Sequence, residues 1–167
     1  GTNTDPYQPI ESRYRITREV LEVCLDARHP VTITTKSDRV LADLDLIEEM
    51  ARKSLIAVAI SVTSLDPHLS RLIEPRAPSP AKRLSALGKL VEAGVPAHCS
   101  IAPVIPAITD DAMEGIVARV AELWRWVLPG FQNAGVFVSH FVSCISGSMV
   151  RINTLARWVL CETIDEE

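Results

Sequence analysis

Apolar residues recur with two different periods along the first 122 residues, and the two periods alternate. Short runs rich in β-branched residues are typical of strands, and they occupy residues 31–35, 55–62 and 95–104. Apolar residues three and four positions apart are typical of amphipathic helices, and they occupy residues 11–28, 40–52, 80–93 and 109–122. The pattern therefore predicts helices and strands in alternation, joined by short connections.

This alternation predicts an α/β fold built from βα repeats with a parallel sheet. Parallel neighbours need a crossover of a dozen or more residues, which the predicted helices supply. Both an open doubly wound sheet and a partial or complete barrel fit the string of elements. In either architecture ligands bind at the carboxyl ends of the strands, so the residues that follow each strand are candidates for function.

The composition changes near residue 122. The first 122 residues hold 31 of the 38 Asp, Glu, Lys and Arg residues, whereas residues 127–150 hold none, and every Trp and Phe lies after residue 122. Two hypotheses account for the divergent tail 123–167: a reading-frame shift between residues 122 and 130, or a genuine last strand at 134–145 followed by a helix at 149–161. Polar residues such as Gln132 and His140 interrupt the uncharged stretch, which argues against a membrane span.

Charge and cysteine content exclude several classes of function. With 17 basic and 21 acidic residues the chain has a net charge of −4, so it offers no general positive field for nucleic acid or an anionic membrane. The spacing of Cys24, Cys99, Cys144 and Cys161 matches neither a Cys-x-x-Cys metal site nor a disulfide framework, and predicts a reduced, cytoplasmic setting. The His residues share no metal-ligand spacing, and the sequence has no glycine-rich phosphate loop.

Residues with useful chemistry follow each predicted strand. Lys36 can offer its ammonium to a carboxylate or phosphate, and Ser61 and Thr63 place two hydroxyls on one face of their strand. Residues 100–110 form an apolar, proline-stiffened segment suited to a ligand ring. Each feature also has a purely structural interpretation. Lys36 can be an ordinary surface residue, the hydroxyls can cap the turn after their strand, and residues 100–110 can simply pack against the core. The basic cluster at residues 71–89, with its single acidic residue, predicts a solvated helix face.

The segments at the strand ends form an ordered series of short motifs. The series is GTNTDPYQPIE at residues 1–11, TKS at 35–37, DLDL at 43–46, SVTSLD at 61–66, EPRAPSP at 74–80 and APVIP at 102–106. Taken together, these motifs resemble the radical S-adenosylmethionine (SAM) enzymes. They are most similar to the spore photoproduct lyase-like subgroup, also described as DNA repair photolyase-like proteins. The resemblance covers residues 1–122.

The resemblance implies a (β/α)6 partial TIM-type barrel that is incomplete here at its N-terminal side, because residues 1–122 would begin at the end of the second strand. It implies a lyase-like enzyme that cleaves SAM reductively at a [4Fe-4S] cluster to a 5′-deoxyadenosyl radical. The substrate is unknown, and DNA photoproduct repair follows by analogy only. The implied partners are SAM and an electron donor such as flavodoxin or ferredoxin. The net charge does not support nucleic acid as a partner, and no membrane is expected.

By the same resemblance, nine residues are implied to contact SAM. The loop at residues 1–6 would face its amino group, and Lys36 its carboxylate. Ser61 and Thr63 would face the ribose or carboxylate side, and residues 102–104 would flank the adenine. The residues are Thr2, Asn3, Asp5, Lys36, Ser61, Thr63, Ala102, Pro103 and Val104.

The cysteine loop that binds the cluster in the family, Cys-x3-Cys-x2-Cys, is absent from this sequence, and its four cysteines are too far apart to replace it. We therefore expect no metal ligands in this chain, cluster cysteines upstream of Gly1, and no activity from the chain alone. The catalytic residues are unknown. Two alternatives stay open: a non-catalytic α/β binding module that has lost the cluster, and an aldolase-like barrel enzyme in which Lys36 forms a Schiff base.

Overall fold

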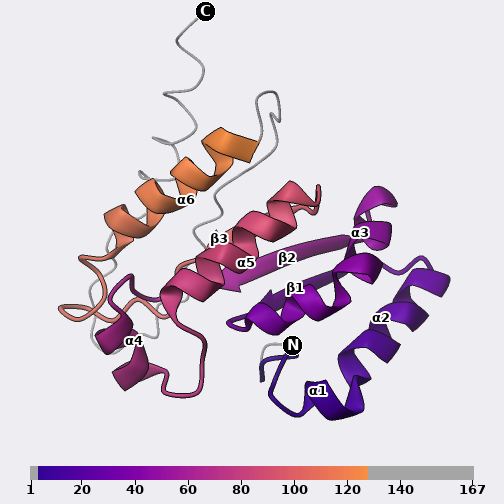
Figure 1. Ribbon diagram of the computed structural model, residues 1–167, viewed down its shortest axis with the longest axis horizontal. Helices are drawn as coiled ribbons and strands as arrows, with labels where there is room; N and C mark the ends of the chain where they lie inside the picture. Colours follow the sequence, from indigo (N-terminus) through magenta and orange to yellow (C-terminus); the bar gives the residue numbers. More distant parts are fainter. Residues whose placement is uncertain (1–3, 128–167) are drawn as a thin grey trace, which may run out of the picture.

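A computed structural model describes residues 4–127, in which helices pack on a small parallel sheet (Figure 1). The elements in chain order are α1 (Glu11–Tyr14), α2 (Ile16–Asp26), β1 (Val31–Thr35), the 3₁₀ helix η1 (Asp38–Asp43), α3 (Leu44–Arg52), β2 (Ile56–Ser61), α4 (Pro67–Ile73), α5 (Pro80–Glu92), β3 (Ala97–Ser100) and α6 (Met113–Val127). Figure 1 shows α2, α3 and α5 on one side of the strands.

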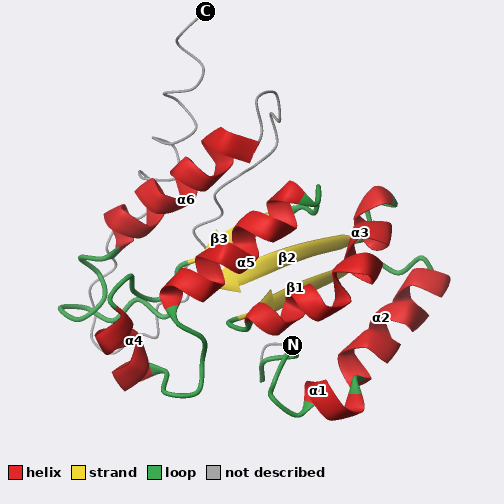
Figure 2. Cartoon of the chain, viewed as in Figure 1, coloured by secondary structure: helices red, strands yellow, loops and turns green. Residues whose placement is uncertain are grey.

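The sheet has the order β1-β2-β3, and its strands run parallel. Thr35, the last residue of β1, lies opposite Ile60 of β2. Ser61, the last residue of β2, lies opposite Ser100 of β3. The strands therefore end at nearly the same level, and the loops that follow them start from one end of the sheet (Figure 2). The predicted α/β fold with a parallel sheet in βα units is confirmed, whereas closure into a barrel stays a prediction.

The middle strand β2 forms the centre of the core. Val58 and Ile60 are fully buried, as are Ile47 and Met50 of α3 and Leu87 of α5. A parallel strand between other elements is expected to be a continuous apolar run, which explains the pattern of β2. Packing of α3 and α5 against β2 holds the end of the strand, and therefore the loop that follows it, in place.

Two predicted helices are subdivided in the structure. Residues 11–28 form α1 and α2 rather than one helix, because Arg15 adopts a left-handed conformation with φ of 53°. Residues 40–52 begin within the 3₁₀ helix η1 and continue as α3. The Ser37 hydroxyl caps η1 by accepting a hydrogen bond from Arg39 N at 3.2 Å. Apolar spacing detects both helical regions but not the break between their parts, because the spacing of side-chain types does not record a local change of backbone conformation such as that at Arg15.

The third strand and the segment after β2 also differ from the prediction. β3 has four residues rather than the ten of 95–104, because Pro96 and Pro103 flank it and have no N–H to donate to the sheet. Helix α4 was not predicted at all. It begins at Asp66, whose carboxylate accepts a hydrogen bond from His68 N at 2.8 Å, with Pro67 in the first turn. An Asp-Pro pair is a recognised helix start, so this signal was present in the sequence.

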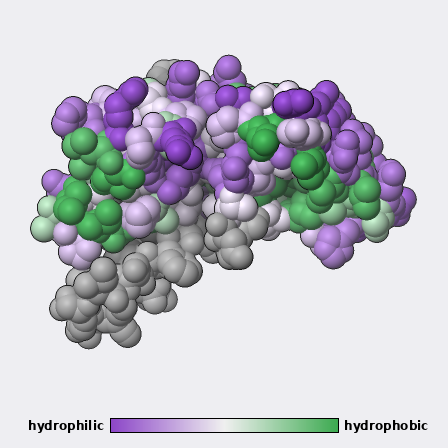
Figure 3. All heavy atoms as spheres, turned by 90° about the horizontal axis from the view of Figure 1, so that it is seen from below, coloured by the Kyte–Doolittle hydropathy of each residue, from purple (hydrophilic) through white to green (hydrophobic). Residues whose placement is uncertain are grey.

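Large apolar side chains are exposed on the segments around α1, α2 and α4. In the view of Figure 3, hydrophobic residues gather over α4 and over α1 and α2. The residues are Ile10, Ile16, Val20, Val23 and Leu72, each at least 54% exposed. These side chains make no contribution to the core, and their apolar surface is available for contact with other molecules or other parts of the protein.

The last described helix, α6, continues to Val127, beyond the predicted end at residue 122. The strand and helix predicted at 134–145 and 149–161 lie outside the described residues, so the two hypotheses for the tail are not distinguished. Within residues 4–127, no helix combines the length and apolar character needed to cross a membrane.

Gly94 has φ of +74°, a conformation that L side chains rarely adopt, and nothing lies within 4 Å of a Cβ built there. We expect Gly94→Ala to lower the free energy of unfolding by about 1 kcal/mol, because it adds backbone strain without a clash. In the matched change Gly88→Ala, inside α5, the nearest atom to the new Cβ is Leu123 Cδ2 at 3.9 Å. This change should raise the free energy of unfolding by roughly 0.5–1 kcal/mol through helix propensity. Urea unfolding measures both, and effects of the same sign would contradict this explanation.

Candidate functional site

The loops after β1, β2 and β3 meet at one end of the sheet (Figure 2). Lys36 directly follows β1, Thr63 follows β2, and Ala102 follows β3. The Thr63 hydroxyl lies 3.0 Å from the carbonyl oxygen of Ala102, to which it can donate. This contact joins the segments after the middle strand and after β3, both of which were predicted to line the cofactor site.

Glu74 lies at the centre of this end of the sheet, although no pattern in the sequence predicted a role for it. Its Oε1 lies 2.5 Å from Lys36 Nζ and 3.1 Å from Thr63 Oγ1, and its Oε2 lies 2.5 Å from an Nη atom of Arg83. The side chain of Glu74 is 8% exposed, whereas that of Lys36 is 36% exposed. One buried carboxylate therefore links the loops after β1 and β2 to helix α5.

Arg83 is buried rather than solvated, with its side chain 1% exposed. Its guanidinium donates to the carbonyl oxygens of Pro78 at 2.8 Å and Ser61 at 3.1 Å, and to Glu74. The fixed fork of guanidinium donors suits one carboxylate and two carbonyls. The prediction that residues 71–89 form a solvated helix face is therefore wrong for this residue. The available signal was the single acidic residue, Glu74, in an otherwise basic segment.

Burial and neighbouring cations act in opposite directions on Glu74. Burial is the largest single contribution and raises the pKa of the carboxyl group. The contacts with Lys36 and Arg83 together outweigh it, so the pKa of Glu74 lies below its ordinary value. Glu74 is therefore ionised at neutral pH and attracts both cations.

Asp5 ties the N-terminal loop to the end of β1. Its Oδ1 accepts hydrogen bonds from Thr35 Oγ1 at 2.6 Å and from Tyr7 N at 2.8 Å, and its Oδ2 accepts one from Lys36 N at 2.7 Å. Two of these three hydrogen bonds come from Thr35 and from the backbone of Lys36 itself. Asp5 therefore holds the backbone from which the Lys36 side chain extends.

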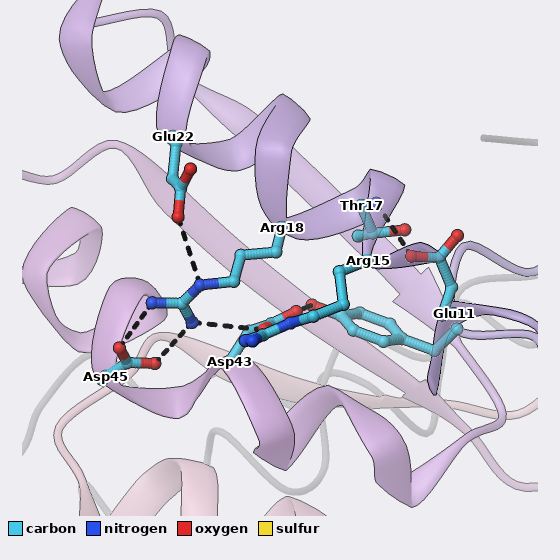
Figure 4. A network of polar contacts seen from close by, with 8 residues as sticks. Glu11, Arg15, Thr17, Arg18, Glu22, Asp43 and Asp45 are labelled. Atoms are coloured by element: carbon cyan, nitrogen blue, oxygen red, sulfur yellow. Dashed lines mark hydrogen bonds and ion pairs between the residues drawn. The ribbon is translucent and has the colours of Figure 1, made fainter. Parts of the chain in front are cut away.

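A second polar network holds the N-terminal loop and α2 against the segment after β1 (Figure 4). The hydroxyl of buried Tyr7 donates to Asp43 at 3.2 Å, and Arg18 of α2 donates to Asp43 at 3.2 Å and to Asp45 at 2.7 and 2.8 Å. The pKa of Tyr7 lies far above its ordinary value, mainly because the side chain is buried and also because the Asp43 carboxylate is in contact with its hydroxyl. The hydrogen bonds from Arg18 lower the pKa of Asp45 to about 2. The acidic residues of the DLDL motif thus fix the segment that follows Lys36.

Residues 102–104 form a half-buried, largely apolar rim after β3. The Ala102–Pro103 peptide bond is cis. The buried Thr109 hydroxyl braces this rim from behind, since it accepts a hydrogen bond from Ile105 N at 2.8 Å and lies 3.4 Å from the carbonyl oxygen of Pro103. An apolar surface held in this way can pack against a planar ring.

Besides Asp5, whose carboxylate accepts hydrogen bonds from Tyr7, Thr35 and Lys36, the residues that the resemblance assigned to SAM fall into three groups. Lys36 and residues 102–104 are partly exposed at the carboxyl end of the sheet. Ser61 and Thr63 are buried, and the Ser61 carbonyl accepts a bond from Arg83. Thr2 and Asn3 lie outside the described residues.

The described part of the chain does not fit an iron–sulfur cluster. In residues 4–127 no group of three or more His, Cys, Asp and Glu side chains could hold a metal ion. Cys99 of β3 is buried, and burial raises the pKa of its thiol to about 12, which disfavours the thiolate form that binds iron. Cys24 lies on α2, a helix that contacts α3, and not on a loop at the carboxyl end of the sheet.

A groove of about 580 Å³ lies between α5 and α6, lined by residues that include Leu84, Gly88 and Leu123. It contains none of the residues predicted to bind SAM. A second groove, of about 340 Å³, lies beside Tyr7 and Arg15 in the N-terminal network. Neither of these two grooves lies at the strand ends, whereas the charged and polar groups described above cluster there. We place the candidate site at the strand ends, because ligands of parallel α/β sheets bind there.

Replacing Asp5 tests whether the N-terminal loop depends on its carboxylate. Asp5→Asn turns one acceptor oxygen into an amide donor that faces another donor, and we expect the free energy of unfolding to fall by about 1–3 kcal/mol. Asp26→Asn, at the exposed end of α2, is the matched control and should change stability by less than about 0.5 kcal/mol. Urea unfolding measures both, and an Asp5 variant as stable as the control would show that these hydrogen bonds contribute nothing.

The lowered pKa of Glu74 predicts a pH dependence of stability. Because the folded state binds protons less readily, the stabilisation is fully present above the unfolded-state pKa of about 4.5 and is lost as the pH falls through the lower folded-state value. Glu74→Gln cannot ionise, so its free energy of unfolding should change less than that of wild type between about pH 5 and pH 3. Glu49→Gln is the control, because Glu49 loses only its contact at 2.7 Å with the exposed Lys53. The pH dependence of its free energy of unfolding should stay closer to that of wild type. If the free energy of unfolding depends on pH equally in wild type and in Glu74→Gln, the lowered pKa of Glu74 is refuted.

Relatives of this chain come from bacteria, archaea and an archaeal virus. An uncharacterized protein of Mycobacterium tuberculosis is 38% identical over 123 residues, which are 72% of this chain and 36% of the relative. An uncharacterized protein of Methanocaldococcus jannaschii is 38% identical over 107 residues, 64% of this chain and 40% of the relative. An uncharacterized protein of Acidianus two-tailed virus is 35% identical over 121 residues, 71% of this chain and 39% of the relative.

The match to these relatives thus spans 36–40% of their length. No solved structure matches this chain. The sequence profile of the radical SAM superfamily matches residues 1–120, which contain the whole sheet and each strand-end segment described above. Because this match covers most of the sequence, the chain belongs to the radical SAM superfamily.

Proposed function

We propose that this chain forms part of the SAM-binding site of an enzyme that cleaves SAM reductively at a [4Fe-4S] cluster. Membership of the superfamily supports the class of enzyme. The observation that carries the proposal is the arrangement of Lys36, Thr63 and Ala102 around the buried carboxylate of Glu74. This arrangement lies at the carboxyl ends of parallel strands, where α/β proteins bind their ligands.

Lys36 is the residue proposed to bind the SAM carboxylate. Its side chain is 36% exposed, so the ammonium is within reach of a ligand. An ammonium has three N–H donors, and the ion pair with Glu74 uses one of them. The remaining donors can bind a second carboxylate, here that of the cofactor.

The other predicted contacts surround this anchor. The apolar rim of residues 102–104 is proposed to lie against the adenine, since a braced apolar surface suits an aromatic ring. Ser61 and Thr63 lie beneath the ribose or carboxylate side. The loop that holds Thr2, Asn3 and Asp5 is tied to the backbone of Lys36 and is proposed to face the SAM amino group.

The proposal places the cluster cysteines in a part of the protein outside this chain, which spans 36–40% of its relatives. The chemistry that the cluster and SAM supply together is one-electron cleavage to methionine and a 5′-deoxyadenosyl radical, which abstracts a hydrogen atom from the substrate. The electron comes from a donor such as flavodoxin or ferredoxin. The residues of this chain contribute binding, orientation and exclusion of water at the apolar rim.

The finer assignment is to the spore photoproduct lyase-like subgroup, with a partial (β/α)6 barrel of which residues 1–122 are one part. The ordered motifs at the strand ends support it. This subgroup suggests a lyase reaction on damaged DNA, but a net charge of −4 gives the chain no general attraction for DNA. The reaction class is therefore proposed here without a substrate.

The structure weakens the aldolase-like alternative. A Schiff base would have to form at the Lys36 nitrogen, which is in contact with the Glu74 carboxylate at 2.5 Å, so the reaction would have to break this ion pair. The binding-module alternative makes a different prediction, because such a protein would purify without iron.

Replacing Lys36 in the intact protein tests the proposal. Lys36→Met keeps most of the side-chain volume and removes the charge, and we expect the affinity for SAM to fall by about 10- to 100-fold while the iron content stays unchanged. Lys53→Met is the matched control, because Lys53 also forms an ion pair at 2.7 Å but lies on the exposed surface of the segment after α3. Anaerobic titration calorimetry measures the dissociation constant. Unchanged affinity in Lys36→Met would remove Lys36 from the site, and a protein without iron would favour the binding module.

A further inference from the structure

We propose that Glu74 is a positioning residue, which Arg83 holds in place and which in turn sets where Lys36 presents its ammonium to SAM. This inference rests on the proposed function, because it assumes that Lys36 binds the SAM carboxylate. Glu74 is the first residue of the EPRAPSP motif, but neither its residue type nor the resemblance gave it a role.

The orientation of Glu74 is fixed from the helix side. Its Oε2 faces Arg83, whose guanidinium also donates to the carbonyl oxygens of Pro78 and Ser61. Because Arg83 is buried and bound at three points, it cannot follow Glu74 to another position. The carboxylate is therefore held with its Oε1 toward the loops after the strands.

Lys36 is the flexible member of this group. A Lys side chain has four rotatable bonds, and an exposed ammonium ordinarily samples many positions. The contact at 2.5 Å with Glu74 restricts Lys36 Nζ before any ligand arrives. Ordering that precedes binding removes part of the entropic cost of binding, so the affinity for a carboxylate at this point increases.

Thr63 connects the same oxygen to the rim. Its hydroxyl lies 3.1 Å from Glu74 Oε1 and 3.0 Å from the carbonyl oxygen of Ala102. The groups proposed to bind the carboxylate and the adenine are therefore placed relative to one buried atom. Because the Thr63 hydroxyl still reaches the carbonyl oxygen of Ala102 when Glu74 is changed, we expect Glu74→Gln to act mainly through Lys36.

The Lys36–Glu74 pair differs from an ordinary surface ion pair of this protein. Glu49 and Lys53 are also in contact, at 2.7 Å, but their side chains are 46% and 49% exposed and they lie one helical turn apart. Water screens such a pair and either partner can move away. Glu74 is buried, its partner comes from a distant loop, and Arg83 prevents its displacement.

A double-mutant cycle in the holoenzyme tests the inference. SAM affinity is measured by anaerobic titration calorimetry for wild type, Glu74→Gln, Lys36→Met and the double variant, together with iron content and urea unfolding. If Glu74 acts through Lys36, Glu74→Gln weakens SAM binding by about 5- to 10-fold in wild type but by less than about 2-fold when Lys36 is already Met. Glu49→Gln is the control for loss of a paired carboxylate, and should leave the affinity unchanged.

The outcomes separate this inference from the proposed function. Suppose that Lys36→Met weakens SAM binding, but that Glu74→Gln lowers the affinity equally in wild type and in Lys36→Met, or does not lower it at all. The inference is then wrong, and the proposed role of Lys36 stands. If Lys36→Met leaves the affinity unchanged, both fail. Should Glu74→Gln not fold because Arg83 loses its carboxylate, the variant that carries both Glu74→Met and Arg83→Met replaces the buried pair with apolar side chains. It should fold and still bind SAM weakly, and wild-type affinity in this variant would overturn the inference.

Discussion

The buried ion pair between Arg83 and Glu74 is the interaction on which this end of the molecule depends. Moving two charges out of water is costly, and the cost is offset only when nearly every donor and acceptor finds a partner. Here Arg83 binds two carbonyl oxygens and the carboxylate, and Glu74 receives Lys36 and Thr63 in addition. The pair therefore constrains the end of β2, the start of α5 and the loop after β1 at once.

Two acidic residues in the N-terminal half, Asp5 and Asp43, also hold separate segments of the chain together through hydrogen bonds. Asp5 binds the backbone and side chains at the end of β1, and Asp43 joins Tyr7 of the N-terminal loop to Arg18 of α2. Motif residues at the strand ends thus divide into those that build the walls of the candidate site and those, such as Lys36, that face its opening.

This division explains why a small sheet can present a defined ligand surface. Three parallel strands end at nearly one level, and each is followed by a segment that contributes to the same cluster. The helices on one side fix the strands, while the ion pair and the hydroxyl of Thr63 fix the loops. A binding surface built on loops gains precision when buried polar contacts hold those loops to the scaffold.

The sequence by itself determined the alternation of helices and strands, the strand 31–35 to the residue, the helix that begins at Pro80, and Lys36 as a residue with suitable chemistry. Those features follow from local spacing and side-chain type, which do not depend on how distant segments of the chain pack together. Only the tertiary structure decided that Arg83 is buried, that Glu74 joins it to Lys36, and that Asp5 holds the backbone of β1. These contacts join residues far apart along the chain, and their partners are chosen by packing of the helices and the sheet, which no local pattern encodes.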